Sequence, residues 1–130
     1  MMAEITDKKK ILIIDDNKDL NTVLADKLSV SGFETSSAFD GEEGLAKAFE
    51  THPDVILLDM LMPKMDGLTT LKKLRDDAWG KTCKVMILTL IEETDYMAKT
   101  MEFNVIGYIV KTNQSLDEIV REIEMTIKNS

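Results

Sequence analysis

The sequence has few cysteines, prolines and aromatic residues, and no apolar run of membrane-spanning length. Its single cysteine, Cys83, cannot form a disulfide within the chain, which indicates a reducing compartment. Residues 1–7 lack the apolar core of a signal peptide, so we expect a cytoplasmic protein that is not anchored to a membrane. Positive charge is also scarce, since 16 Lys and Arg accompany 24 Asp and Glu for a formal net charge of −8. This balance argues against direct nucleic-acid binding, which needs a clustered positive surface.

The chain does contain short apolar runs, and most of them are continuous over four residues. Continuous runs of this kind are typical of parallel strands that are buried on both faces. The second run, over residues 33–38, is interrupted by Ser and Thr and suits an edge position in the sheet. The strands are predicted over residues 11–14, 33–38, 55–58, 85–88 and 105–110.

Amphipathic stretches separate these runs and predict helices. The helices are predicted from about residue 18 and over residues 42–50, 67–77, 92–103 and 115–128. We expect Phe49 to be buried in the second helix, and Met97 and Met101 to face inward in the fourth. Strands that alternate with helices predict an α/β domain with a doubly wound parallel sheet covered on both faces. A chain of 130 residues suits one such domain, over residues 10–130, behind a flexible lead over residues 1–9.

Chemically active side chains stand where the strands end. They are Asp15 and Asp16 after the first strand, Asp59 after the third, Thr89 on the fourth and Lys111 after the fifth. The carboxyl ends of parallel strands meet at one edge of a sheet, so we expect these side chains to converge. Three carboxylates there would repel one another by about 4 kcal/mol per pair at ~4 Å and an effective dielectric of ~20, which calls for a cation.

The type of cation and the chemistry follow from the residue types. Oxygen ligands favour Mg²⁺, which keeps several waters that a phosphate can replace. A lysine and a hydroxyl opposite the carboxylates would complete a cradle for a phosphoryl group. The combination fits an aspartate nucleophile that becomes an aspartyl phosphate.

These motifs resemble the receiver domain of two-component response regulators, the group that includes the chemotaxis regulators. The matching segments are residues 13–16, 57–59, 62–67, 87–89 and 107–111, in the family's order and spacing. The resemblance implies a flavodoxin-like sheet with strand order 2-1-3-4-5 and five helices. It implies a phosphorylation-controlled switch rather than a dedicated enzyme, with no chemistry beyond its own phosphorylation and slow dephosphorylation. Its partners would be a sensor histidine kinase or phosphotransfer protein, and an effector protein or an output domain.

The resemblance also assigns the metal and acceptor residues by position. Asp59 would accept the phosphoryl group. Asp16 and Asp59 would ligate Mg²⁺ directly, together with the backbone carbonyl of Leu61. Asp15 would act on the ion mainly through a bound water.

The remaining roles concern phosphoryl binding and switching. Lys111 would neutralise phosphoryl oxygens, and Thr89 would move to hydrogen-bond them. Tyr108 would then swing inward behind Thr89. The surface that changes would comprise the fourth helix, the fifth strand and the fifth helix.

Some residues depart from the family pattern. Leu90 follows Thr89 where the family usually has Ala or Gly, and Leu61 and Ile91 are apolar at positions that influence water access. From these we hypothesise slow loss of phosphate, because an attacking water finds no polar guide. Thr112 replaces the proline that commonly follows the lysine, so we expect no cis peptide there, since a non-proline cis bond costs about 2.5–4 kcal/mol.

Other interpretations stay open at the level of sequence. A phosphatase of the haloacid dehalogenase type also uses an aspartate and Mg²⁺, but it carries a second aspartate where this chain has Leu61. A pseudo-receiver would keep the fold as a plain interaction module. Asp15 and Asp16 would then only cap the first helix, a role that also suits Asn17, and Tyr108 would be a static, half-buried aromatic.

Overall fold

The computed structural model describes residues 8–90 and 94–130, which form five strands and five α-helices in alternation. The strands are β1 (Lys10–Ile14), β2 (Glu34–Ala38), β3 (Val55–Leu58), β4 (Lys84–Thr89) and β5 (Gly107–Val110). The helices are α1 (Lys18–Val30), α2 (Gly41–Thr51), α3 (Gly67–Asp76), α4 (Thr94–Met101) and α5 (Leu116–Lys128), with a short 3-10 helix, η1 (Lys111–Asn113). Most of the predicted lead over residues 1–9 lies outside the described residues. Within the described ranges, no helix has the length and apolar character needed to cross a membrane.

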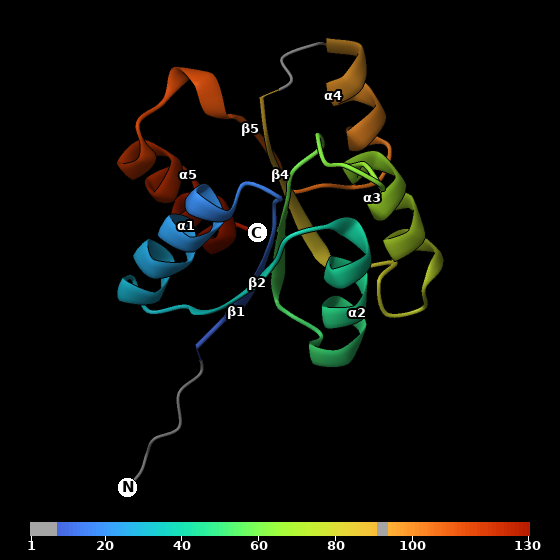
Figure 1. The fold of residues 1–130 in the computed structure, drawn as a ribbon, viewed down its shortest axis with the longest axis horizontal. Helices are drawn as coiled ribbons and strands as arrows, with labels where there is room; N and C mark the ends of the chain where they lie inside the picture. Colours follow the sequence, from blue (N-terminus) through green and yellow to red (C-terminus); the bar gives the residue numbers. More distant parts are fainter. Residues whose placement is uncertain (1–7, 91–93) are drawn as a thin grey trace, which may run out of the picture.

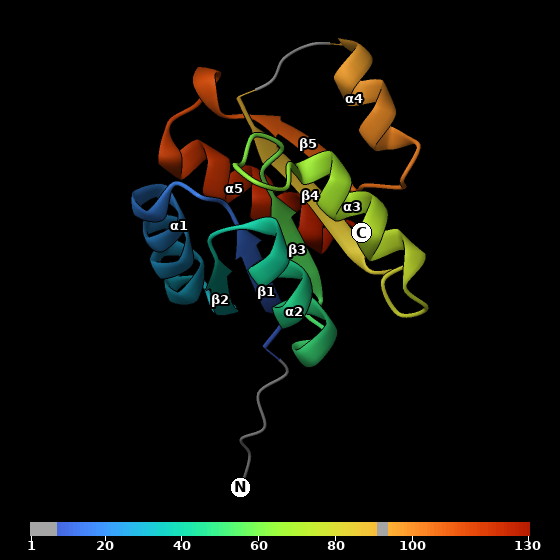
Figure 2. The same cartoon turned by 45° about the vertical axis from the view of Figure 1, so that its right-hand side comes forward.

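The strands pair in parallel in the order β2-β1-β3-β4-β5, which confirms the predicted topology. Figure 2 shows them side by side, with β2 at one edge and β5 at the other. Ile14 pairs with Leu58, and Leu58 pairs with Ile87. Because of this register, the residues that follow β1 and β3 leave the sheet at the same level. The register therefore brings Asp15 and Asp59 together.

The helices cover the sheet on both faces. Figure 1 shows α1 and α5 on one side and α2, α3 and α4 on the other. Ile11 and Ile13 of β1 face the first pair, whereas Leu12 and Ile14 face the second group. All four side chains are at most 2% exposed. Burial on both faces explains why this strand is apolar without alternation.

Capping residues fix where the helices begin. The side chain of Asp66 accepts a hydrogen bond from the N–H of Thr69 at 2.8 Å and starts α3. Ser115 and Glu118 form a reciprocal capping box at the start of α5. Such caps satisfy backbone donors that have no partner within the helix. The caps of α3 and α5 thus fix where the loops before these helices end.

Some predicted details are wrong. Met101 is 49% exposed, and Thr100 is the fully buried residue of α4 instead. The Thr100 hydroxyl donates to the carbonyl of Met97 at 2.8 Å, so this buried hydroxyl has its partner within the same helix. Phe49 is 39% exposed, and its ring packs edge-on against Trp79 instead of joining either core cluster. The predicted first residues of α4, 92 and 93, lie outside the described part of the chain.

The fifth strand is shorter than expected and begins at Gly107 instead of residue 105. Asn104 has a φ of 58°, a left-handed conformation that commonly closes a helix. The chain needs the next two residues to turn back toward the sheet. Ile106 already donates its N–H to the carbonyl of Val85 at 2.8 Å, which starts the approach of β5 to β4.

Candidate functional site

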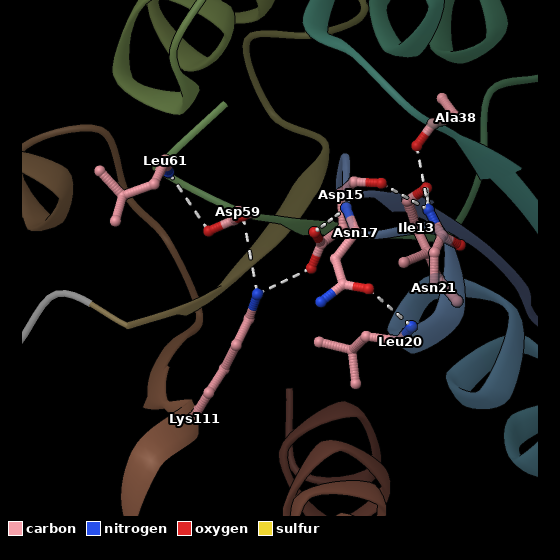
Figure 3. A network of polar contacts seen from close by, with 9 residues as sticks. All are labelled: Ile13, Asp15, Asn17, Leu20, Asn21, Ala38, Asp59, Leu61 and Lys111. Atoms are coloured by element: carbon pink, nitrogen blue, oxygen red, sulfur yellow. Dashed lines mark hydrogen bonds and ion pairs between the residues drawn. The ribbon is translucent and has the colours of Figure 1, made fainter. Parts of the chain in front are cut away.

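Lys111 lies between two buried carboxylates at the carboxyl edge of the sheet, as Figure 3 shows. Its Nζ is 2.8 Å from Oδ2 of Asp15 and 3.6 Å from Oδ2 of Asp59. The side chains are 11% exposed for Lys111, 3% for Asp15 and 6% for Asp59. The residues that directly follow β1, β3 and β5 are far apart in the chain and thus meet in one buried ion cluster, as the sequence predicts.

Three carboxylates share this place. One oxygen from each of Asp15, Asp16 and Asp59 lies within 4.8 Å of the others. Asp15 and Asp59 are buried, whereas Asp16 is exposed. A set of ligands that consists of oxygen alone, with an open side, suits a hard divalent cation. The predicted acidic cluster is therefore present.

The pKa of Asp59 is raised from 3.8 to about 6. Burial is the main cause, and the negative charge of Asp15 adds to it. The charge of Lys111, the N–H of Leu61 and the hydroxyl of Thr89 act in the opposite direction and lower the pKa. The Leu61 N–H donates to Oδ1 of Asp59 at 3.2 Å. One lysine thus faces two buried carboxylates, and the site favours a further positive charge.

Asp15 is held through every polar atom that it has. Its N–H donates to the carbonyl of Ala38 at 3.1 Å, and its own carbonyl accepts from the Nδ2 of Asn21 at 3.0 Å. Its Oδ1 accepts from the N–H of Asn17 at 2.9 Å, while Oδ2 pairs with Lys111. Asn17 is also the cap of α1 through Leu20. Asn17 therefore caps α1 and also belongs to the hydrogen-bond network of Asp15, so a capping role does not exclude a functional one.

The two predicted switch residues occupy neighbouring strands. Thr89 is the last residue of β4, is 0% exposed and hydrogen-bonds Asp59. Tyr108 of β5 is half-buried and packs on the sheet face that carries α2 and α3. Thr89 thus belongs to the ion cluster, whereas Tyr108 pairs with Ile87 two residues earlier, and the movement of both on phosphorylation stays a prediction.

Apolar side chains stand at the rim of the cluster. Leu61 is 52% exposed and Leu90 is 53% exposed, so both project into solvent beside the strand ends that carry Asp59 and Thr89. Ile91, the third residue in the water-access hypothesis, lies outside the described residues. The peptide bond between Lys111 and Thr112 is trans, as predicted.

Two residues near the site had no role in the sequence analysis. Asn21 is buried within α1. Its spacing from Leu24 and Leu28 places a polar residue on the core face of the helix, and this pattern could have indicated a role for it. Tyr96 of α4 lines a groove of about 380 Å³ together with Asp16, Asp66 and the loop after β3. Burial, then Asp66 and Asp59, raise the pKa of Tyr96 above its usual range. The placement of Tyr96 depends on how α4 sits on the sheet, which no short-range pattern reveals.

Comparisons with known proteins agree with this site. Residues 11–124 match the family model of the response regulator receiver domain. The chain is 33% identical over 128 residues to the alkaline phosphatase synthesis transcriptional regulatory protein PhoP of Bacillus subtilis, covering 94% of this chain and 52% of that protein. It is 37% identical over 102 residues to the transcriptional regulatory protein PrrA of Mycobacterium leprae, covering 78% of this chain and 43% of that protein. The chain thus spans about half the length of these curated relatives.

Solved structures give the same answer for the fold. The chemotaxis protein CheY4 of Vibrio cholerae superposes with a TM-score of 0.83 at 26% identity, covering 92% of this chain and 98% of that one. The receiver domain of the Francisella response regulator 1452 gives a TM-score of 0.81 at 30% identity, covering 94% and 98%. The family model spans nearly all of the residues that form the sheet, the helices and the acidic cluster. The chain belongs to the receiver domain family of two-component response regulators.

Proposed function

We propose that the chain, as a receiver domain over residues 10–130, accepts a phosphoryl group on Asp59 in a Mg²⁺-dependent reaction and thereby switches its output surface. The donor would be a phosphohistidine on a sensor histidine kinase or phosphotransfer protein. The observation that carries the proposal is the placement of Asp59, buried at the end of β3, 3.6 Å from Lys111 and within the three-carboxylate cluster. Asp15 shares these neighbours, but its carboxylate lies 2.8 Å from Lys111 and also accepts a hydrogen bond from the N–H of Asn17.

The donor set fits Mg²⁺. Both carboxylate oxygens of Asp15 already accept hydrogen bonds, from Asn17 and Lys111, so this residue suits contact with the ion through a water. Asp16 is exposed and suits direct contact, as does Asp59 together with the carbonyl of Leu61. When bound, the ion would neutralise the carboxylates and polarise the phosphoryl group.

The protein's own residues would then carry out the transfer. A carboxylate oxygen of Asp59 attacks phosphorus, and the phosphorus–nitrogen bond to the donor imidazole breaks as the new bond forms. Lys111 would exchange its contact with Asp59 for the phosphoryl oxygens. The hydroxyl of Thr89 lies within hydrogen-bond reach of Asp59 and would move onto the same oxygens. Fixed donors of this kind stabilise negative charge as it develops.

The readout would be a shift between two arrangements of α4, β5 and α5. Thr100 is the one fully buried residue among those described in α4, which leaves this helix lightly anchored. Movement of Thr89 and Tyr108 would change how α4 packs on the rest of the domain. The partner that senses the change would be an effector protein or an output domain. Two of the curated relatives are named as transcriptional regulators and are about twice the length of this chain.

Intact-mass spectrometry after incubation with acetyl phosphate and Mg²⁺ tests the proposal. We expect the wild-type chain and the exposed control Asp26→Asn to gain one phosphoryl group, and Asp59→Asn to gain none. A wild-type chain that never gains mass would identify a pseudo-receiver. Steady hydrolysis of a phosphomonoester such as p-nitrophenyl phosphate would identify a phosphatase instead.

A further inference from the structure

A buried asparagine in α1 reaches across to two strand ends beside the acidic cluster. Asn21 is 0% exposed. Its Nδ2 lies 3.3 Å from the carbonyl oxygen of Ile13, 3.0 Å from that of Asp15 and 3.0 Å from that of Ala38. Figure 3 shows these contacts together with those of Asp15 and Lys111. One amide group thus joins α1 to the ends of β1 and β2.

The orientation of this amide is determined by its neighbours. If the amide were rotated by half a turn, Oδ1 would face three carbonyl oxygens, which would repel it. In the observed orientation Oδ1 is buried and has no hydrogen-bond partner among the described residues. A buried acceptor without a partner destabilises a fold, and asparagine has a low propensity for helix interiors. The amide therefore serves the carbonyls that its Nδ2 binds, while its Oδ1 stays unpaired.

The contacts of Asn21 influence the direction in which the carboxylate of Asp15 points. Pairing of β1 with β2 ends at Ile14 and Ala38, and the chain must then turn toward α1. At this turn Asn21 holds the carbonyl of Asp15, while Asn17 and Lys111 hold its carboxylate. The backbone of Asp15 is thereby fixed on one side and its side chain on the other.

We propose that Asn21 is a positioning residue for the metal-dependent phosphorylation: by holding the Asp15 carbonyl against the end of β2, it sets where the carboxylates of Asp15 and Asp16 stand relative to Asp59. The inference rests on the proposed function, because it concerns the same metal site. Asn21 does not touch the ion or the phosphoryl group. It acts as the outer partners of metal ligands do, whose loss typically lowers metal affinity by about 10- to 100-fold.

The test measures Mg²⁺ affinity on the unphosphorylated protein, separately from stability. Asn21→Leu keeps the number and branching of the side-chain heavy atoms and removes the amide donors, and Asn21→Ser leaves a single hydroxyl donor. Leu28→Ala is the matched control, since Leu28 is 0% exposed in the same helix and its loss opens a cavity away from the carboxylates. Unfolding in urea ranks stability, and isothermal titration calorimetry gives the Mg²⁺ dissociation constant of each folded protein.

We expect Asn21→Leu to raise the dissociation constant for Mg²⁺ by about tenfold, Asn21→Ser to raise it less, and Leu28→Ala to leave it unchanged despite its lower stability. If Asn21→Leu does not fold, a Kd for Asn21→Ser that exceeds the wild-type value supports the proposal by itself. Wild-type affinity in the folded Asn21 variants would overturn the positioning role while leaving the proposed function intact. A wild-type chain that binds no Mg²⁺ would overturn both.

Discussion

The carboxylate of Asp59 lies where burial and Asp15 disfavour negative charge, and its pKa is about 6 instead of 3.8. An aspartate whose pKa is raised by folding destabilises the folded state at any pH above both values, because the unfolded chain ionises more readily. One pKa unit corresponds to about 1.4 kcal/mol, and coupling to Lys111 and solvent screening reduce the total. We therefore expect Asp59→Asn to raise the free energy of unfolding by about 2 kcal/mol at pH 7.5 without Mg²⁺.

The pH dependence of this difference has a definite sign. The gain should be full above pH 7, shrink as the pH falls through 6 and vanish near pH 4, where the wild-type carboxyl is protonated in both states. Urea unfolding at several pH values measures it. Asp26→Asn, which removes an exposed charge from α1, controls for the lower net charge. A gain that does not change between pH 4 and 7.5 would contradict this account of Asp59.

Leu61 offers a second test at the scale of one side chain. Its backbone N–H binds Asp59, while its side chain is 52% exposed at the rim of the site. A water that attacks the phosphorylated aspartate would pass this hydrocarbon without a polar group to orient it. We expect Leu61→Asn to shorten the lifetime of the phosphorylated form several-fold, measured as loss of radiolabelled phosphate. Val30→Asn, at a position 89% exposed near the far end of α1, should leave the lifetime unchanged.

At the scale of elements, the strands and helices that depend on neighbours in sequence could be predicted. Four-residue apolar runs marked β1, β3 and β4, and the acids and the lysine that follow the strands met as expected. Short-range patterns failed where packing decides. The sequence of α4 offers Met97 and Met101 as inward residues, and Met97 is half-buried, but Met101 is exposed, Thr100 is buried and Tyr96 reaches the groove beside Asp66. A helix with few apolar residues can rest on the sheet by several faces, and only the complete fold selects one.

The same weak anchoring predicts a difference in mobility between α4 and α5. Helix α5 buries Ile119, Val120, Ile123 and Ile127 and has a capping box, whereas α4 buries Thr100. Elements with few buried apolar contacts open most readily. We expect the amides of residues 95–101 to exchange with deuterium faster than those of residues 119–127. Equal protection of both helices, measured by mass spectrometry of peptides, would contradict this view of the output surface.

Arg75 of α3 connects this helix to the segment that follows α4 through hydrogen bonds. Its Nε donates to the carbonyl of Phe103 at 2.8 Å, and its Nη1 donates to those of Gly80 and Cys83, each at 2.7 Å. Loss of these charge-assisted bonds leaves carbonyls without their donors. We expect Arg75→Met to lower the free energy of unfolding by about 2 kcal/mol and to speed exchange of residues 98–104. Lys72→Met, an exposed position one turn earlier in α3, should do neither.

The site and the stability of the whole molecule are coupled through its acidic charge. A net charge of −8 and a cluster of three carboxylates both favour cations, but among the described residues only the cluster gathers three carboxylate oxygens within 4.8 Å of one another. Specific Mg²⁺ binding to the folded state should therefore raise the free energy of unfolding by about 2.7 kcal/mol at a hundredfold excess over the dissociation constant. Sodium chloride at equal ionic strength would only screen charge.

Asp16→Asn, which alters an exposed member of the cluster, should fold as well as wild type without metal and lose most of the Mg²⁺ effect. If sodium chloride stabilises wild type as strongly as Mg²⁺ does, or if Asp16→Asn keeps the full response, the ion acts on the general surface charge and the carboxylates after β1 and β3 are not its site.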